Sequence, residues 1–270
     1  MTKTALLTGA TGGIGSAIAA DLHARGYQLT LVDFDAQRLA QMAEIYSTST
    51  MQLLDQTDMS AVEAFCDQMS APDTRTFDVV ILNAGGINIG DLADLPRDRM
   101  LWELQINLIS NATLIQAFAR RMKAAGSGHI LVTVSMGALV SLKGSATYSA
   151  AKFGLRGLLW GLRDELRPHG VNVTGVYPAG VDTPMLRHEA RHGGSALNFI
   201  NKPGTAQDVA NAFMRAIDKP RLEVYVPYSE SFLARFTNAF PWLSHYAYPL
   251  FERIGERGRK KFLDRIGSED

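Results

Sequence analysis

The chain has 270 residues, of which 46% are hydrophobic and 20% are charged, a composition typical of a globular protein. Its 27 Lys and Arg residues balance its 27 Asp and Glu residues, so the net charge gives no reason to expect nucleic acid as a partner. The only cysteine, Cys66, excludes an intramolecular disulfide and a cysteine-based zinc site. Nothing near the N-terminus resembles a signal peptide, and we expect a cytoplasmic protein.

Apolar runs alternate with amphipathic segments along most of the chain. The apolar runs predict strands at residues 4–8, 28–35, 50–58, 77–86, 129–135, 171–178 and 222–227. Periodic apolar residues between them predict helices at residues 16–27, 36–46, 60–69, 97–125, 148–166 and 205–217. This alternation predicts an α/β, doubly wound (Rossmann) fold, with a parallel sheet of about seven strands and helices on both faces.

The predicted elements form one domain with a tail. We expect a single catalytic domain over residues 1–227 and an aromatic and basic C-terminal extension over residues 228–270. Residues 183–204 contain no long periodic segment, and we expect them to be irregular or locally helical.

The first predicted strand leads directly into the glycine-rich turn "GATGGIG" and then into a helix. Gly9, Gly13 and Gly15 would let the backbone approach a pyrophosphate, whose charge the helix N-terminus stabilises. Asp33 ends the second strand, where a carboxylate accepts both ribose hydroxyls of NAD and repels the 2′-phosphate of NADP. Arg38, the nearest basic residue, lies a turn into the next helix. NAD is therefore favoured over NADP, although Asp33 could also be only a turn or cap residue.

Four segments, taken in order, resemble the short-chain dehydrogenase/reductase family. They are "TGATGGIG", "NAG" at Asn83–Gly85, Ser135, and "YSAAK" at Tyr148–Lys152. The resemblance extends from residue 4 to about residue 226 and implies a nicotinamide-dependent oxidoreductase, in which residues 183–204 form a mobile substrate lid.

The chemistry explains why a tyrosine and a lysine occur at this spacing. Tyr148 and Lys152 lie one helical turn apart and share a face of their helix. The Lys152 ammonium would stabilise the phenolate of Tyr148, which could then take the proton of an alcohol while hydride passes to nicotinamide. Ser135 would hydrogen-bond the substrate oxygen. The resemblance implies that Asn107 supports a water-linked proton relay through Lys152.

The resemblance also implies cofactor contacts along the chain. Asp55 would contact adenine, Asn83 would brace the central strands, and Val181 and Thr183 would hold the carboxamide. The complete set of expected cofactor residues is Gly9, Thr11, Gly12, Gly13, Ile14, Gly15, Asp33, Asp55, Asn83, Ala84, Gly85, Tyr148, Lys152, Pro178, Val181 and Thr183. The chain departs from the family at Ala179, where a glycine is usual. If the backbone needs a positive φ there, Ala179 adds strain; otherwise it narrows the site.

The segment "HEARH" (His188–His192) matches a pattern that binds catalytic zinc in many metalloproteases. A zinc enzyme needs a third protein ligand and a helix that continues on both sides, whereas "GGS" follows His192 directly. Ser195 and Asn198 stand where the extended motif requires Gly and His. We interpret the match as a coincidence within a charged lid helix and expect no metal site, although His188 could line the substrate entrance.

The expected substrate residues are mostly apolar, and no arginine is placed to bind a carboxylate. They are Met136, Ala138, Leu142, Met185 and Leu186. This set favours a hydrophobic secondary alcohol or ketone over a small acid.

The C-terminal extension is rich in aromatic residues. Its longest uncharged run, residues 236–251, contains Pro241 and Pro249 and is too short and too broken to span a membrane. Basic residues follow this run at Arg257, Arg259, Lys260 and Lys261. We expect the extension to cap a pocket or to pack on a second subunit, with peripheral contact with a membrane surface as a less favoured alternative. The family resemblance implies a homodimer or homotetramer.

These observations predict an NAD-dependent oxidoreductase that interconverts a hydrophobic secondary alcohol and its ketone, with Tyr148 as the acid/base. One alternative is an NADPH-dependent carbonyl reductase, and another is a non-catalytic NAD-binding sensor or scaffold of the same fold. The sequence leaves the substrate, its stereochemistry and the physiological direction open.

Overall fold

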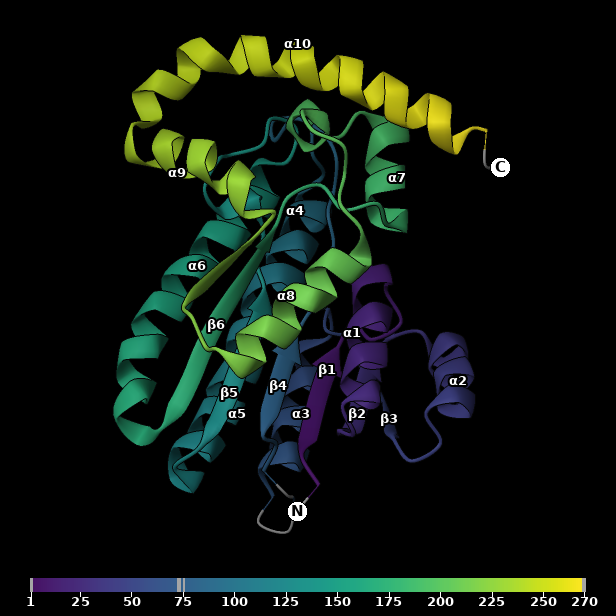
Figure 1. Ribbon diagram of the computed structural model, residues 1–270, viewed down its shortest axis with the longest axis vertical. Helices are drawn as coiled ribbons and strands as arrows, with labels where there is room; N and C mark the ends of the chain where they lie inside the picture. The colour runs from purple at the N-terminus through teal and green to yellow at the C-terminus, as the bar shows by residue number, and fades with distance from the viewer. Residues whose placement is uncertain (1, 72–73, 75, 269–270) are drawn as a thin grey trace.

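A parallel seven-stranded sheet runs through the centre of the molecule (Figure 1). The computed structural model describes residues 2–71, 74 and 76–268, with the side chains of all of these except 243–245. The sheet has the strand order β3-β2-β1-β4-β5-β6-β7, which confirms the predicted doubly wound α/β fold. The strands are β1 (Thr4–Thr8), β2 (Gln28–Asp33), β3 (Thr50–Leu53), β4 (Val79–Leu82), β5 (Gly128–Thr133), β6 (Val171–Pro178) and β7 (Glu223–Val226).

The central strands are continuous apolar runs because both faces of the sheet are covered. Ala5, Leu6 and Leu7 of β1 are completely buried. Leu7 lies opposite Leu31 of β2 on one side and Ile81 of β4 on the other, and these pairings set the register of the three strands.

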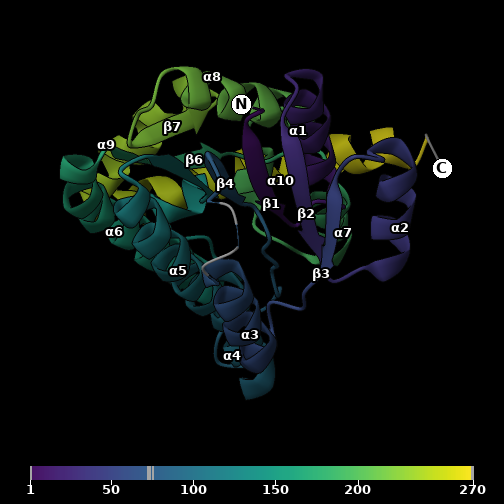
Figure 2. The ribbon, with the colours of Figure 1, turned by 90° about the horizontal axis from the view of Figure 1, so that it is seen from below.

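Helices pack on both faces of the sheet (Figure 2). On one face, α1, α2 and α8 contribute to an apolar cluster that includes Ile18 and Phe213. On the other face, α3, α5 and α6 contribute to a cluster that includes Leu114 and Leu155. The helices are α1 (Gly13–Ala24), α2 (Ala36–Ile45), α3 (Met59–Ser70), α4 (Arg97–Leu104), α5 (Ser110–Ala125), α6 (Ala146–Leu166), α7 (Pro184–His192), α8 (Ala206–Asp218), α9 (Ser231–Ala239) and α10 (Pro241–Ile266).

The winding of the chain reverses between β1 and β4, which are neighbours in the sheet. Loops that leave the carboxyl ends of such strands run in opposite directions and leave a crevice between them. The glycine turn follows β1 and the "NAG" segment follows β4, so the topology brings both to this crevice.

The C-terminal arm, which we define as α9 and α10 (residues 231–266), crosses the top of the molecule in Figure 1. Its long helix α10 packs on the lid, residues 183–204, which contains α7 and the 3-10 turn Ala196–Phe199. Phe262 and Ile266 of α10 form a small apolar cluster with Leu186, Ala190 and Phe199 of the lid. Within the described residues, no helix combines the length and the apolar character that a membrane span requires.

Two glycines let α10 lie directly on the lid backbone. A Cβ atom at Gly255 would overlap the carbonyl oxygen of Ala196, and one at Gly258 would overlap that of Phe199. An ion pair between Arg265 Nη2 and Asp182 Oδ2 (2.7 Å) adds a polar contact near the end of the helix. The arm therefore packs closely on the outer side of the lid.

Candidate active site

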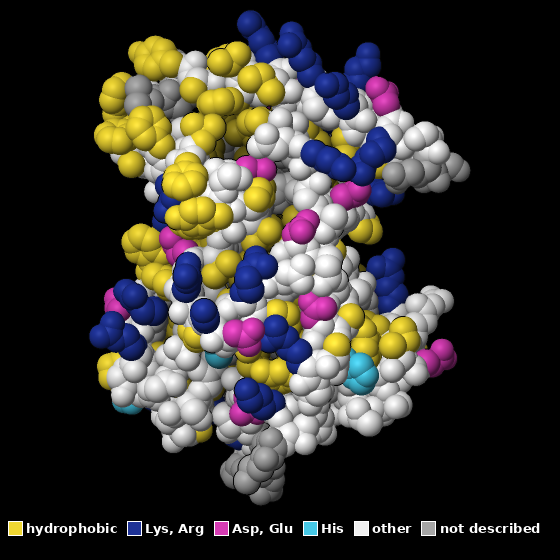
Figure 3. Space-filling view, viewed as in Figure 1, with side chains coloured by type: hydrophobic (Ala, Val, Ile, Leu, Met, Phe, Trp, Pro, Cys, Tyr) yellow, Lys and Arg dark blue, Asp and Glu magenta, His cyan; other side chains and the backbone are white. Residues whose placement is uncertain are grey.

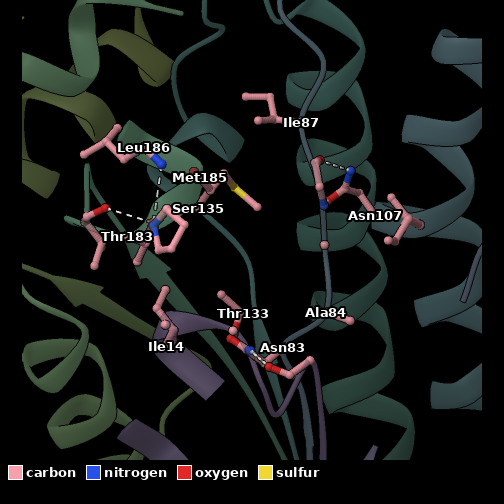
Figure 4. Close-up of a pocket in the computed structure, with 18 of the residues that line it drawn as sticks. Ile14, Asn83, Ala84, Ile87, Asn107, Thr133, Ser135, Thr183, Met185 and Leu186 are labelled. Carbon is pink, nitrogen blue, oxygen red and sulfur yellow. Dashed lines mark hydrogen bonds between the residues drawn. The ribbon is translucent and has the colours of Figure 1, made fainter. Parts of the chain in front are cut away.

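A cavity of about 330 Å³ opens at the carboxyl ends of the central strands. Figure 4 shows its walls: Thr183, Met185 and Leu186 belong to the lid, while Asn107 stands on the opposite side. Of the residues expected to contact the cofactor or to take part in catalysis, all except Gly15 line this cavity. The structure therefore brings together positions that are spread over most of the chain.

The glycine turn leaves the N-terminus of α1 open toward the cavity. Gly9 has a φ of 63°, and a Cβ atom there would lie 2.8 Å from the Cα of Ala84. Gly12 and Gly13 are exposed and line the cavity. The N-cap residue Gly12 has no side chain that could accept a hydrogen bond from the first amides of α1. These amides therefore remain available to an anion. The turn fits the pyrophosphate of a dinucleotide.

Gly15 differs from the other turn glycines because it does not line the cavity. It packs beneath the turn, where a Cβ atom would overlap the carbonyl oxygen of Gly9. The glycine is required there for close packing of α1 against the turn, and the expected direct contact with the cofactor is not what the geometry shows.

Asp33 stands at the end of β2 with 6% of its surface exposed. Its Oδ2 accepts a hydrogen bond from the Thr11 amide (2.9 Å), and its Oδ1 accepts one from the Phe34 amide (2.8 Å). These bonds hold the carboxylate beside the glycine turn. Arg38 also lines the cavity, and its Nε lies 3.3 Å from Oδ2 of Asp35.

Asn83 connects two strands at the floor of the cavity. Its Nδ2 donates to the Gly9 carbonyl oxygen (3.1 Å), and its Oδ1 accepts from the Thr133 hydroxyl (2.9 Å). Asp55 lies elsewhere on the lining, where its Oδ1 accepts from the amide (2.8 Å) and the hydroxyl (2.7 Å) of Thr57. The short residues Ala84 and Gly85 complete this part of the wall.

Ser135 and Tyr148 meet in the cavity, one just after β5 and the other in the first turn of α6. Oγ of Ser135 accepts a hydrogen bond from the Gly137 amide (2.9 Å). Burial raises the pKa of the Tyr148 phenol, a hydrogen bond with Ser135 lowers it, and the charges of Glu189 and Glu103 raise it. The phenol therefore needs nearby positive charge to act as a base near neutral pH.

Lys152 supplies that charge from the same face of α6. Only 3% of Lys152 is exposed, its Nζ donates to the Thr133 carbonyl oxygen (3.1 Å), and Nζ lies 5.5 Å from the centre of the Tyr148 ring. Burial lowers the pKa of Lys152 to about 8. The ammonium form still predominates near pH 7, and it favours the phenolate form of Tyr148.

The helical stretch predicted at residues 97–125 is interrupted at the cavity. Between α4 and α5, residues Gln105–Ile109 form a π-helical turn that contains Asn107. Nδ2 of Asn107 donates to the carbonyl oxygens of Glu103 (2.9 Å) and Gly86 (2.7 Å). Because the side chain competes for the carbonyl four residues earlier, the backbone hydrogen bonds shift by one residue. Asn107 thus ties the helix to the cavity wall at Gly86.

The loop after β6 forms another part of the lining. Pro178, Val181 and Thr183 all line the cavity, and Oγ1 of Thr183 caps α7 by accepting from the Leu186 amide (3.4 Å). No non-glycine residue in the described part of the chain has a positive φ. Ala179 therefore replaces the usual glycine without the backbone strain that we considered.

The structure divides the expected substrate residues into two groups. Leu142, Met185 and Leu186 line the cavity, whereas Met136 and Ala138 are absent from the described lining. Ser135 begins a 3-10 turn over Met136–Ala138, in which Ala138 is completely buried in the core cluster beneath α6 and the half-buried Met136 packs against that cluster. Ala138 therefore packs in the core instead of facing a ligand, whereas Met136 lies half-buried at the edge of that core.

The "HEARH" segment forms most of α7, and its Glu side chain lies apart from its two His side chains. The rings of His188 and His192 stack with their centres 4.1 Å apart, while Glu189 lines the cavity with 5% of its surface exposed. Oε2 of Glu189 accepts a hydrogen bond from Nδ2 of Asn198 (3.0 Å). Among the residues whose placement is described, no three His, Cys, Asp or Glu side chains form a group that could hold a metal ion.

Glu189 is a titratable residue of the cavity that we did not predict from the sequence. Burial raises its pKa to about 7, although the hydrogen bond from Asn198 opposes the shift. Leu186 and Ala190, four residues apart, mark one apolar face of this helix, but that spacing did not indicate that Glu189 points into the cavity. From the sequence we interpret this segment as a charged lid helix, with no role for Glu189 in the site.

Comparison with known proteins agrees with this arrangement. A family model described as short chain dehydrogenase matches residues 3–193. A 1-deoxy-11-beta-hydroxypentalenate dehydrogenase from Streptomyces exfoliatus is 31% identical over 232 residues, which are 83% of this chain and 82% of that protein.

Solved structures show the same architecture. A short-chain dehydrogenase from Streptomyces avermitilis superposes with a TM-score of 0.78 at 24% identity, over 93% of this chain and 98% of that one. A protein from Beutenbergia cavernae, provisionally assigned as an NAD(P)-dependent gluconate 5-dehydrogenase, superposes with a TM-score of 0.73 at 26% identity, over 83% and 94% of the two chains. The chain belongs to the short-chain dehydrogenase family and is an oxidoreductase of that family.

Proposed function

We propose that the protein is an NAD-dependent oxidoreductase that interconverts a hydrophobic secondary alcohol and its ketone. One observation supports this above all others: Ser135, Tyr148 and Lys152 line the same cavity as the glycine turn. A protein that only binds a dinucleotide has no need of a buried lysine beside a tyrosine at that place.

The three side chains have separate roles in this proposal. A nicotinamide bound in the cavity would accept or return the hydride. Ser135 orients the substrate oxygen, and Tyr148 removes the hydroxyl proton in oxidation or returns it in reduction. Lys152 keeps positive charge 5.5 Å from the centre of the phenol ring and so counters the effect of burial on the tyrosine. Asn107 holds the backbone at Gly86 and keeps this wall in position.

The preference for NAD is inferred from Asp33. Its carboxylate stands at the rim of the cavity beside Thr11, where it would accept ribose hydroxyls and repel a 2′-phosphate. Arg38 supports the second candidate, an NADPH-dependent carbonyl reductase, because it also lines the cavity. The Beutenbergia cavernae protein was solved with NADP at low occupancy. Against this candidate, Arg38 already pairs with Asp35. Titration of the purified protein with each cofactor distinguishes the two candidates.

The substrate class is inferred from the apolar lining. Leu142, Met185 and Leu186 face the space next to Ser135 and Tyr148, together with Ile87. Glu189 is the acidic group that lines this part of the cavity, and its charge would repel a substrate carboxylate bound next to it. The relative from Streptomyces exfoliatus is named for a hydroxylated compound, which agrees with an alcohol as the reduced substrate.

The test is a screen of NAD reduction against secondary alcohols that are graded in size and polarity. We expect turnover to rise with apolar surface, and we expect Tyr148→Phe to lower kcat by about 10³-fold with little change in the NAD dissociation constant. Activity in Tyr148→Phe comparable to that of the wild type would contradict the proposed role of Tyr148 as the acid/base. Tight NAD binding without turnover of any alcohol would favour the sensor or scaffold alternative.

A further inference from the structure

Large apolar side chains are exposed together on the C-terminal arm. Figure 3 shows them as a yellow group over α9 and the first half of α10. Trp242 is 64% exposed and Tyr246 is 77% exposed, values unusual for side chains of this size. The members of this apolar group are Phe232, Leu233, Phe236, Phe240, Trp242, Tyr246, Leu250 and Ile254.

Helix α10 has one face that packs on the lid and one face that is exposed to solvent. Its inner face carries Gly255, Gly258, Phe262 and Ile266, which pack on the lid. The exposed residues on the other side recur at intervals of three to four residues and therefore share the outer face. Along the helix this outer face changes from apolar to basic, and its residues are Trp242, Tyr246, Leu250, Arg253, Ile254, Arg257, Lys260 and Lys261.

The arm is positively charged although the whole chain is neutral. Residues 231–266 contain seven basic and three acidic residues, a net charge of +4, so the rest of the chain carries −4. Two of the three acids are already paired, Glu252 with Lys143 (2.9 Å) and Glu256 with Arg259 (2.6 Å). Four exposed basic residues make no ion pair with any described residue: Arg253, Arg257, Lys260 and Lys261.

We propose that the C-terminal arm docks on an anionic membrane surface, with the outer face of α10 lying in the plane of the lipid headgroups. Aromatic residues followed by a basic segment on one helical face are the features of helices that bind at such an interface. Docking would bury the apolar group between headgroups and bring the basic residues next to lipid phosphates. The interaction does not depend on the reaction that the cavity performs.

Charge favours a membrane over a second copy of this chain as the occupant. A symmetric dimer whose twofold axis passes near the basic half of α10 would place the same basic residues of two arms close together. An anionic membrane instead offers charge of the opposite sign over the whole length of α10. Because α10 packs on the lid, docking would also place the lid close to the lipid, which suits an enzyme for apolar substrates.

The experiment measures partition of the full-length protein onto vesicles by co-sedimentation. Vesicles of phosphatidylcholine alone are compared with vesicles that contain phosphatidylglycerol as well, at low and at high salt. We expect binding to the anionic vesicles, weak binding to the neutral ones, and loss of binding as salt screens the charges. A blue shift of Trp emission that is absent in Trp242→Phe would report burial of the aromatic segment.

Matched variants separate the apolar and the basic parts of the surface. Arg257→Gln/Lys260→Gln/Lys261→Gln should weaken partition onto the anionic vesicles by about 10²-fold, because each basic residue near the lipid contributes a similar free energy of binding. The control is Arg120→Gln/Lys123→Gln/Lys219→Gln, which removes the same charge from exposed positions on α5 and just after α8. Trp242→Ser/Leu250→Ser should also weaken binding, whereas Ile45→Ser/Leu53→Ser, which changes exposed side chains near the β3 edge, should not.

Three results would overturn the proposal. Absence of partition onto anionic vesicles at low salt would do so directly, as would equal losses in the arm variants and their controls. The third is a wild-type dimer that becomes monomeric in Trp242→Ser/Leu250→Ser without any vesicle binding, because the occupant would then be a second copy. All variants should retain NAD binding, which shows that they fold.

Discussion

Two pairs of glycines lie at opposite sides of the cavity, and both are places where two backbones touch. Gly9 and Gly15 belong to the first turn of the Rossmann fold, and Gly255 and Gly258 belong to α10 above the lid. The first pair lies where the central strands and α1 meet, next to completely buried residues of β1. The second pair lies between one helix and a short turn, next to a small cluster of five buried residues.

The difference lies in how much structure depends on each contact. The glycine turn joins the sheet, α1 and the cavity, so its geometry affects both folding and cofactor binding. The contact of α10 affects only the lid and the arm, which are held by few other apolar contacts. Segments of that kind open at a lower free energy than the core does. The two regions should therefore respond differently to the same substitution.

Substitution of Gly15 by alanine should have the largest effect. The added Cβ atom would overlap the Gly9 carbonyl oxygen and approach the Cα of Ala10 to 2.9 Å, and neither is a flexible side chain. We expect a loss of about 4 kcal/mol in the free energy of unfolding and a loss of NAD binding. Urea unfolding and calorimetric titration measure the two quantities. Wild-type stability in Gly15→Ala would show that the turn can move, and would remove the contrast between the regions.

Substitution of Gly255 by alanine should be more local. The new Cβ atom would overlap the Ala196 carbonyl oxygen, so α10 must shift away from the lid. We expect a loss of about 3 kcal/mol in the contact between arm and lid, visible as faster proteolysis within residues 241–266. NAD affinity should stay unchanged. A parallel fall in NAD affinity would mean that the arm and the cofactor cavity are one cooperative unit.

Glu189→Gln should stabilise the protein by an amount that grows from about pH 4.5 and is complete above pH 7. The folded-state pKa of Glu189 is raised to about 7, so the folded protein keeps a proton that the unfolded chain releases as pH rises from about 4.5. Wild-type stability therefore falls across that range, and the cost is complete above pH 7. We expect Glu189→Gln to be about 2 kcal/mol more stable than wild type at pH 8.

At pH 4 the two proteins should differ little in stability, since the carboxyl is then protonated in both states. Unfolding in urea at the two pH values measures the difference. A constant difference at both pH values would assign the effect to packing of the lid, because a titration effect requires the pH dependence.

The smallest effect should come from Gly161→Ala on the outer side of α6. A Cβ atom there meets no other atom within 4 Å, so the alanine adds no clash. We expect a gain of about 0.5–1 kcal/mol, because glycine loses more backbone entropy than alanine does in a helix. The variant is the matched control for the other two glycine substitutions. Destabilisation would show that this face of α6 is covered in solution by another molecule.

Much of the fold was predictable because the sequence patterns that specify it are local. The buried strands are rich in apolar residues, and the turn after the first strand is rich in glycine, so the order of strands and helices could be read along the chain. The family resemblance identified Ser135, Tyr148 and Lys152, and helical spacing explains why Tyr148 and Lys152 share one face of α6. A prediction failed where the direction of a side chain depends on packing, as at Ala138, which is completely buried in the core.

The sequence by itself determined the doubly wound sheet and its glycine turn, because apolar period and glycine content act over a few residues, and its resemblance to a known family identified the Ser, Tyr and Lys positions. Tertiary structure alone decided that Glu189 faces the cavity and that α10 rests on the lid. Both depend on contacts between segments far apart in the chain, such as Asn198 with Glu189 and Gly255 with Ala196. No local pattern encodes such a contact, since its free energy arises only when the two surfaces have already come together.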